Sequence, residues 1–437
     1  MADIYKIKGG TQLRGEVSVG GAKNAVLKLM AAAVLAQGET TIFNVPELTD
    51  VGIMLEVISG LGINTSWDKQ QKLVKIDATN ITSVTAKYEY VSKMRASFTI
   101  LGALVSRCKE AIVALPGGCS IGERRVDFHI KGLEALGADI KIENGYVHAK
   151  AKKLVGTDIY LDIPSVGATE NLMLAAILAE GSTRIQNAAQ EPEIVDLANF
   201  LNAMGADVTG AGTSDIIING VKQSDLHPIE YTTIPDRIEA GTFMTAVVAS
   251  RGKAIIKNVF PAHLTFFTDK LIKMGASVKL IEPTAIEVSC KNRLNSINFV
   301  TQPYPGFPTD LQSMAMVLLS TANGVGIITE SLYENRFMQV PHLMRMGADI
   351  HQDRNHAIIK GVKKLTGATV AATDLRAGAA LVVAGIMADG TSIIENLHHV
   401  DRGYENFDKK LSDLGVSIVR CSVGTEEIKG AINESRI

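Results

Sequence analysis

The sequence has little that would hold a protein in a membrane, on a nucleic acid or outside the cell. Its most apolar stretches, residues 172–179 and 379–388, are about half as long as a bilayer span, and its first residues lack the apolar core of a signal peptide. Lys and Arg number 44 against 46 Asp and Glu, a formal charge of -2, whereas nucleic-acid and membrane-surface binders need a net basic face. We therefore expect a cytoplasmic chain with neither partner.

Disulfide, metal and nucleotide motifs are also absent. Four cysteines stand far apart without C-x-x-C spacing, which argues against a disulfide framework or zinc site and fits a reducing compartment. The glycines of GGAKNA and LPGGCSIGERR fit neither the P-loop nor the dinucleotide fingerprint, and there is no H-E-x-x-H or G-x-S-x-G motif. We expect His398 and His399 to pack in a loop, and we expect no metal and no cofactor.

What the sequence does contain is a sixfold repeat. In each copy an apolar helix ends at a glycine that precedes a strand; the glycines are Gly62, Gly137, Gly205, Gly275, Gly347 and Gly415. Glycine suits the left-handed conformation that follows a helix C-terminus. About forty residues before each glycine another apolar helix begins, and a short β-branched run follows it. The repeat is therefore helix–strand–loop–helix–strand, with further strand-like segments before the next copy.

The repeats predict two α/β domains. Their period of roughly seventy residues exceeds that of thin solenoids, so we expect two globular domains of three repeats each. Residues 227–237 hold two prolines and little helical pattern, which places the boundary there. The predicted domains are residues 23–234, and residues 1–22 plus 235–437. A cleft between related halves is a usual place for a ligand.

Cations stand where the first helices of four repeats begin: Lys23, Arg95, Arg237 and Arg376. A cation there opposes the helix dipole, whereas a cation beside free N–H groups binds anions. The loops add Arg124, Arg336 and Arg402. The alternative is pairing with acids close in sequence, namely Asp236, Glu239, Asp374 and Asp401. For any one arginine the two interpretations are even; for the set, phosphate or carboxylate binding is favoured.

The loop of the second repeat differs from the others. Cys119 follows Gly117 and Gly118 and stands shortly before two arginines, while Pro116 stiffens the start of the loop. A thiol beside cations has a lowered pKa and can act as an acid, base or nucleophile near neutral pH. Cys108, on a predicted helix, is instead expected to be a small buried apolar residue.

Eight motifs, in order over residues 4–418, resemble the UDP-N-acetylglucosamine 1-carboxyvinyltransferase family of enolpyruvyl transferases. They are GGAKNA, LPGGCSIG-x-R, SVGATEN, IPDRIEAGTF, YPGFPTDLQ, ENRF, ATDLRAGAALV and DRGYE. The resemblance implies two inside-out, barrel-like α/β domains, each of three βαβαββ-type repeats, that close on the substrates. It implies transfer of enolpyruvate from phosphoenolpyruvate to the 3-hydroxyl of UDP-N-acetylglucosamine, with release of phosphate through a tetrahedral intermediate. This is the first committed step of peptidoglycan synthesis, and we expect a monomer.

The resemblance also implies contacts for both substrates. Lys23 and Asn24 would hold phosphoenolpyruvate, and its phosphate or carboxylate would meet Arg124, Arg376 and Arg402. The nucleotide-sugar would meet Arg95 and the segment Arg124, Arg125, Val126, Asp127 and Phe128. Leu332 would offer a backbone contact.

Two residues would carry out the proton transfers. Asp310 would be the base near the sugar hydroxyl, although Thr309-Asp310 also suits the N-cap of a helix. Cys119 would protonate the methylene carbon from a lid and can form a cysteinyl-pyruvate adduct; fosfomycin alkylates the equivalent cysteine elsewhere in the family. For Asp50, Glu191 and Asp374 a structural role is favoured over a catalytic one.

Three departures and two alternatives remain. Arg125 stands where relatives often have Pro, Ile163-Pro164 precedes SVGATEN where some members have a nucleotide-binding Lys, and Ser120 replaces Thr. An enolpyruvyl transferase acting on shikimate 3-phosphate shares the fold and donor, but the LPGGC loop disfavours it. A catalytically silent sugar-nucleotide-binding paralogue is disfavoured by the intact Lys23, Cys119, Asp310 and Arg402.

We predict that Cys119→Ala abolishes turnover while the fold stays intact, because the methylene carbon then lacks its proton donor. Phosphate release and thermal melting measure the two properties. Mass spectrometry after fosfomycin treatment should find one adduct, at Cys119, in the unaltered chain. Unaltered turnover in the variant would rule out a catalytic role for this thiol.

Overall fold

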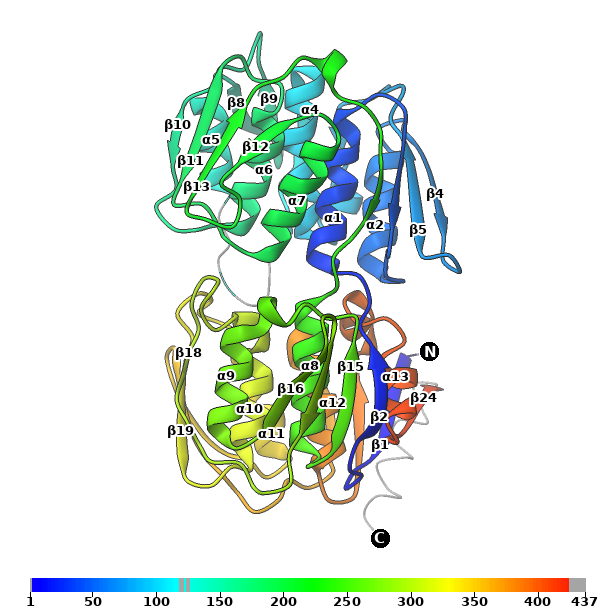
Figure 1. Cartoon of the computed structure of the whole chain (residues 1–437), viewed down its shortest axis with the longest axis vertical. Helices are drawn as coiled ribbons and strands as arrows, with labels where there is room; N and C mark the ends of the chain where they lie inside the picture. The colour runs from blue at the N-terminus through cyan, green and yellow to red at the C-terminus, as the bar shows by residue number, and fades with distance from the viewer. Residues whose placement is uncertain (1, 118–121, 123–125, 424–437) are drawn as a thin grey trace. The chain divides into compact units, whose positions relative to one another are not determined.

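The computed structural model describes residues 2–117, 122 and 126–423. These residues fold into two compact units, and outside residues 118–125 the chain passes between them at Gly20–Gly21 and at Ile234–Pro235. The Lys23 unit comprises residues 21–117 and 126–234, and the Asp310 unit comprises residues 2–20, 122 and 235–423 (Figure 1). Cys119, Ser120, Arg124 and Arg125 lie outside the described residues.

Each repeat of the Lys23 unit supplies an inner and an outer helix. The inner helices are α1 (Lys23–Ala32, continued by the 3-10 helix η1, Ala33–Leu35), α4 (Ile100–Cys108, preceded by η2, Arg95–Thr99) and α6 (Val166–Ala176). The outer helices are α2 (Thr49–Ser59), α5 (Asp127–Ala135) and α7 (Pro192–Ala203), and the connections add α3 (Tyr88–Val91) and η3 (Gln223–Asp225). Helix α4 contacts both α1 and α6, so the inner helices form the centre of the unit.

Three four-stranded sheets of the same design surround these helices. Their strand orders are β14-β3-β5-β4, β6-β7-β9-β8 and β10-β11-β13-β12. The strands are β3 (Glu39–Phe43), β4 (Asn64–Asp68), β5 (Leu73–Asp77), β6 (Thr85–Ala86), β7 (Glu110–Ala114), β8 (Asp139–Glu143), β9 (Tyr146–Lys150), β10 (Asp158–Tyr160), β11 (Ser182–Gln186), β12 (Asp207–Thr209), β13 (Asp215–Asn219) and β14 (Glu230–Thr232). In each sheet one edge strand runs parallel to its neighbour and the other pairs are antiparallel.

The Asp310 unit repeats this design. Its inner helices are α8 (Arg237–Ala249), α10 (Gln312–Ser320, preceded by η5, Thr309–Leu311) and α12 (Leu375–Met387). Its outer helices are α9 (Thr265–Met274, preceded by η4, Pro261–Leu264), α11 (Val340–Arg345) and α13 (Phe407–Asp413, preceded by η6, Leu397–Arg402).

The N-terminal segment completes the sheets of this unit. The orders are β16-β17-β15-β2, β18-β19-β21-β20 and β22-β23-β1-β24. The strands are β1 (Ala2–Lys8), β2 (Arg14–Ser18), β15 (Lys253–Lys257), β16 (Ser277–Glu282), β17 (Ala285–Ser289), β18 (Phe299–Val300), β19 (Val325–Thr329), β20 (Asp349–Asp353), β21 (His356–Lys360), β22 (Thr369–Ala371), β23 (Thr391–Glu395) and β24 (Ser417–Val423).

Burial explains why the helices lie inside and the sheets outside. Every residue of α12 from Arg376 to Ile386 is buried, and a helix that is apolar on all sides belongs in an interior. Strands such as β21 alternate exposed and buried residues, as expected of a sheet with one face in water. Within each unit Figure 1 shows the sheets flanking the helices.

The glycines that revealed the repeat adopt the predicted conformation. All six have positive φ, between 80° and 109°, so the prediction of left-handed residues after the second helices is confirmed. Helices begin at Lys23 and Arg237, the 3-10 helix η2 begins at Arg95, and Arg376 is the second residue of α12. The predicted placement of these cations is confirmed as well. Among the described residues, no helix combines the length and the apolar character that a membrane crossing needs.

A half-buried arginine ties repeats together in the Asp310 unit. Arg293 donates through Nε and Nη2 to the carbonyl oxygens of Thr321, Ala322, Gly361 and Val362, at 2.7 to 3.1 Å. These carbonyl groups belong to the residues just after α10 and β21, which lie beyond the regular hydrogen bonds of the helix and the sheet. A guanidinium can serve them together because its donors form a rigid fork.

We predict that Arg293→Met lowers the free energy of unfolding by about 3 kcal/mol, because hydrogen bonds from a charged donor are worth roughly 1.5–3 kcal/mol each and are not additive. Chemical denaturation measures the loss. Lys291→Met, at an exposed position two residues away, is the matched control and should change stability by less than about 0.5 kcal/mol. Equal losses in the two variants would contradict the assignment.

Candidate active site

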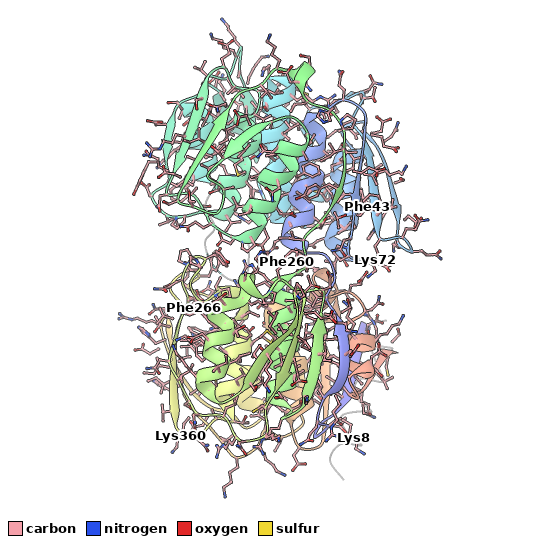
Figure 2. The ribbon with its side chains drawn as sticks, viewed as in Figure 1. Lys8, Phe43, Lys72, Phe260, Phe266 and Lys360 are labelled. Carbon is pink, nitrogen blue, oxygen red and sulfur yellow. The ribbon has the colours of Figure 1, made fainter. Side chains whose placement is uncertain are left out.

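The candidate residues of the Asp310 unit gather at one end of that unit. Figure 2 shows Phe260, shortly after β15, at one end and Lys8 and Lys360 toward the other. Lys360 pairs with the first residue of β19 and Lys8 with the first residue of β23, so these two strands begin at the end of the unit away from Phe260. Strands β15, β19 and β23 therefore all end on the Phe260 side. The helix N-termini lie on the same side, because Asp310 in η5 contacts Arg376 in α12 and Arg336 after β19.

Asp310 is the centre of this cluster. Its carboxylate pairs with the guanidinium of Arg336 at 2.5 Å and with that of Arg376 at 3.6 Å. Both arginines are buried, while the Asp310 side chain is 26% exposed. The structure has Pro308, not Asp310, at the N-cap of η5, so the alternative prediction that Asp310 caps its helix is wrong. The carboxylate is turned to the arginines instead.

The surrounding charges keep Asp310 ionised. Burial opposes ionisation, but the guanidiniums of Arg376 and Arg336, with a further contribution from Arg237, outweigh it and hold the pKa of the Asp310 carboxyl far below its usual range. At least three guanidiniums therefore act on Asp310, while the Asp236 carboxylate is a second acid that acts on Arg376. That excess of positive charge suits an anionic ligand.

Aromatic hydroxyls and rings hold these arginines in place. Arg376 Nη1 donates to the Tyr404 hydroxyl at 3.2 Å, and that hydroxyl also meets Thr242 Oγ1 at 2.9 Å. Arg237, the first residue of α8, lies over the Tyr304 ring with its guanidinium carbon 5.4 Å from the centroid. Arg402 is the last residue of η6 and is half-buried; it lowers the pKa of His399, although burial has the larger effect.

Most of the nearby acids have other functions. Asp236 caps α8 and Asp374 caps α12, each accepting two backbone N–H groups. Glu239 pairs with Lys410 at 2.6 Å and Asp401 with Arg420 at 2.7 Å. The structural role predicted for Asp374 is thus confirmed, and Glu239 and Asp401 pair with cations outside the Asp310 cluster. The rings of His398 and His399 contact each other at a tilt of 38°, with centroids 4.1 Å apart.

In the Lys23 unit the predicted donor contacts open helix α1. Lys23 Nζ pairs with Asp50 in the first turn of α2 at 2.7 Å, and the Asp50 side chain is only 1% exposed. The carboxylate orients the ammonium group, so Asp50 has a structural contact with Lys23. Asn24, the next residue, is half-buried.

Around Arg95 the Lys23 unit buries several polar groups. His129 contacts the Phe98 ring edge-on at 5.2 Å, and its Nδ1 lies 2.8 Å from Asn171 Nδ2. Burial, followed by the charges of Arg95 and Lys28, lowers the pKa of His129 to about 3, so its imidazole is neutral. Lys28 forms a buried ion pair with Glu170. Burial is the main cause that raises the pKa of Glu170 to about 7.

The remaining predicted residues lie at the start of α5 and in the loop after β19. Val126 is the N-cap of α5, and Asp127 and Phe128 are its first residues. The neighbouring Arg124, Arg125 and Cys119 lie outside the described residues. Leu332 follows β19, and because its N–H donates to Glu330 at 2.9 Å, a backbone contact there would use the carbonyl oxygen.

Sequence reasoning left Arg237, Arg336 and His129 out of the predicted site. Both arginines had been noted as cations, and ENRF as a motif, but only the fold brings them to Asp310. His129 carried no signal beyond its place after Asp127. Cys108 is half-buried at the end of α4 and not fully buried as predicted, because its helix ends at the rim of the core.

Comparison with known proteins places the chain in a family. Residues 7–411 match the family model described as EPSP synthase (3-phosphoshikimate 1-carboxyvinyltransferase). A UDP-N-acetylglucosamine 1-carboxyvinyltransferase 2 of Carboxydothermus hydrogenoformans is 52% identical over 419 residues, covering 96% of this chain and 99% of the relative. UDP-N-acetylglucosamine 1-carboxyvinyltransferase 1 of Staphylococcus epidermidis is 50% identical over 420 residues, covering 96% and 99%. The chain belongs to the UDP-N-acetylglucosamine 1-carboxyvinyltransferase family.

Solved structures agree with the two-domain enolpyruvyl transferase fold. The enolpyruvyl transferase NikO from Streptomyces tendae is 25% identical and superposes with a TM-score of 0.88, covering 97% of this chain and 100% of that one. EPSP synthase from Acinetobacter baumannii, at 19% identity and a TM-score of 0.73, covers 97% and 100% and shares the fold. The fold and family predicted from the eight motifs are therefore confirmed.

We predict that Asp310→Asn lowers the melting temperature and makes it strongly dependent on phosphate. The substitution leaves Arg336 and Arg376 facing a neutral amide, and breaking a buried pair costs roughly 3–5 kcal/mol. Inorganic phosphate can replace the lost charge, so at matched ionic strength it should restore several degrees more in the variant than in the unaltered chain.

The matched control is Asp349→Asn at the exposed start of β20. Its melting temperature should respond to phosphate as that of the unaltered chain does. The same phosphate response in Asp310→Asn would contradict an excess of cations around Asp310.

Proposed function

We propose that this chain transfers enolpyruvate from phosphoenolpyruvate to the 3-hydroxyl of UDP-N-acetylglucosamine and releases phosphate. Identity of about half of all residues over nearly the full length of enzymes with this name carries the proposal. The product enters peptidoglycan synthesis, and we place the reaction in the cytoplasm. The free thiols of Cys108, Cys290 and Cys421 support a reducing compartment.

The charges in each unit support the choice of donor. Phosphoenolpyruvate carries a phosphate and a carboxylate, which arginine recognises through paired hydrogen bonds. We assign these groups to Lys23, Asn24, Arg124, Arg376 and Arg402, and the nucleotide-sugar to Arg95, the segment 124–128, Asp310 and Leu332. The Lys23–Asp50 pair supports the assignment because it orients an ammonium group at the start of α1.

The reaction proceeds by addition and elimination. The Cys119 thiol gives a proton to the methylene carbon of phosphoenolpyruvate, the sugar 3-oxygen bonds to the adjacent carbon, and Asp310 takes the hydroxyl proton. The tetrahedral intermediate carries a methyl group, the carboxylate, the phosphate and the sugar oxygen. The Cys119 thiolate then takes back a methyl proton, phosphate leaves with the proton held by Asp310, and the vinyl ether forms. The cations stabilise the anionic groups throughout.

The charge balance decides when Asp310 is a useful base. A carboxylate surrounded by guanidiniums is a weak base, and general bases work best with a pKa near the operating pH. When the anionic groups of the donor engage Arg376, they offset part of the positive charge and raise the pKa of Asp310. Donor binding thereby strengthens the base at the moment an acceptor hydroxyl needs it.

An acceptor assay separates this function from its two alternatives. Phosphate release from phosphoenolpyruvate should require UDP-N-acetylglucosamine, because the acceptor-binding residues are proposed to recognise the nucleotide-sugar and not shikimate 3-phosphate. A coupled phosphate assay with each acceptor in turn measures this. Cys119→Ala serves as the blank and should release at least 100-fold less.

Each contrary result points to one alternative. Release only with shikimate 3-phosphate would identify the other acceptor class. Calorimetric binding of UDP-N-acetylglucosamine without any release would identify a catalytically silent binding protein.

A further inference from the structure

Four repeats end their first strand with the same asparagine. Asn44, Asn187, Asn258 and Asn396 all have φ between 53° and 60°. Each side-chain amide donates to a carbonyl oxygen of the adjacent edge segment, at 2.7 to 3.5 Å; the acceptors are Thr233, Leu161, Val19 and Ala372. Asparagine tolerates this left-handed conformation better than most residues. In these repeats the position is a structural clamp.

The fifth repeat has no such asparagine. After Asn44, Asn187 and Asn258, the N–H of the next residue donates to the hairpin turn of the same sheet, as Val45 does to Lys72. In the fifth repeat β19 ends at Thr329, and the very next residue, Glu330, makes the corresponding bond to Asn355 at 2.8 Å. The left-handed residue is missing, and a carboxylate occupies the start of the loop. Glu330 is only 2% exposed.

Glu330 is held by four hydrogen-bond donors. Oε1 accepts from Thr301 Oγ1 at 2.8 Å, from the Leu332 N–H at 2.9 Å and from the Tyr333 N–H at 3.2 Å. Oε2 accepts from Thr309 Oγ1 at 2.8 Å. A buried carboxylate is tolerated when such bonds replace its water shell.

These donors come from the two loops to which the acceptor contacts were assigned. Thr309 immediately precedes Asp310, and the Leu332 carbonyl oxygen is the backbone group that we assign to the acceptor. Thr301 also links the loops, since its Oγ1 accepts the Ser331 N–H at 2.9 Å and its carbonyl accepts the Ser331 hydroxyl. One carboxylate thus fixes the base and the backbone contact relative to each other.

We propose that Glu330 is a positioning residue for the acceptor, setting the distance between Asp310 and the Leu332 carbonyl. This inference rests on the proposed function. Glu330 acts through the groups that it holds and contacts neither substrate itself. Misplacing a reacting group by about 1 Å can cost on the order of 100-fold in rate, so a single clamp between the loops has a large effect on turnover.

Three variants test the role by steady-state kinetics and calorimetry. Glu330→Ala removes all four bonds and should raise both the KM and the Kd for UDP-N-acetylglucosamine at least tenfold and lower kcat roughly 100-fold. The KM for phosphoenolpyruvate should change less than about threefold, because Glu330 bonds to none of the assigned donor contacts and is linked to Arg376 only indirectly, through Thr309 and Asp310. Glu330→Gln keeps an acceptor for the backbone N–H groups and a polar partner for Thr309, and should recover at least tenfold of the lost kcat.

Thr309→Val cuts only the link to the Asp310 loop. It should lower kcat about tenfold with little change in Kd for the acceptor. Combined with Glu330→Ala it should add no further loss, because the two substitutions break the same bond. The matched control is Asn258→Gly, which removes the clamp of the fourth repeat while glycine tolerates its positive φ. It should lower the melting temperature and leave kcat and both KM values within twofold.

The outcomes separate this role from the function on which it rests. Absence of phosphate release by the unaltered chain would count against the proposed function, and the calorimetric Kd would still test Glu330. A Kd and kcat for Glu330→Ala within twofold of the unaltered chain would overturn the positioning role. Should Glu330→Ala fail to fold, unchanged kcat in both Glu330→Gln and Thr309→Val, with additive effects on stability, would overturn it equally.

Discussion

The imbalance of charge around Asp310 is the constraint on which the rest of the Asp310 unit depends. Buried guanidiniums are costly unless paired, yet Arg336, Arg376 and Arg237 converge on one carboxylate. Tyr404 and Tyr304 supply a hydroxyl and a ring to these arginines, but neither adds a full negative charge. Under the proposed function the phosphate and carboxylate of the donor supply the missing negative charge. In that function Arg376 belongs both to the donor contacts and to the cations that set the pKa of Asp310.

The repeated architecture explains how such a cluster can be built. In each repeat the first strand follows the first helix in the sequence and runs back along it, so the strand ends beside the N-terminus of the helix. Three helix N-termini and three loops therefore share one end of a unit. The buried inner helices α8 and α12 and their aspartate caps hold those ends rigidly. Function then requires only local departures from the repeat. Two are evident at the same position, where the second repeat has Leu115 leading into the Cys119 loop and the fifth has Glu330.

Local requirements were readable from the sequence and distant pairings were not. The six glycines predicted the ends of the second helices because the left-handed conformation is decided by one residue. The N-cap alternative for Asp310 failed because its carboxylate pairs with arginines 26 and 66 residues away in the chain. Glu330 gave no signal at all, since a glutamate at a strand end is ordinary until four donors from two loops are found around it. The motifs found the family, but the fold was needed to group the charges.

Glu330 and Asp310 show how environment assigns different work to the same functional group. Glu330 accepts hydrogen bonds from hydroxyl and backbone N–H groups that belong to the protein itself, so its oxygens are already occupied. Its contribution is to hold the two loops in position. Asp310 is surrounded by cations that an incoming anion can engage, so under the proposed function its basicity changes when the donor binds. A carboxylate held by neutral donors can fix a loop without responding to the substrate. A carboxylate held by substrate-binding cations must respond, and under the proposed function that response couples donor binding to proton transfer from the acceptor.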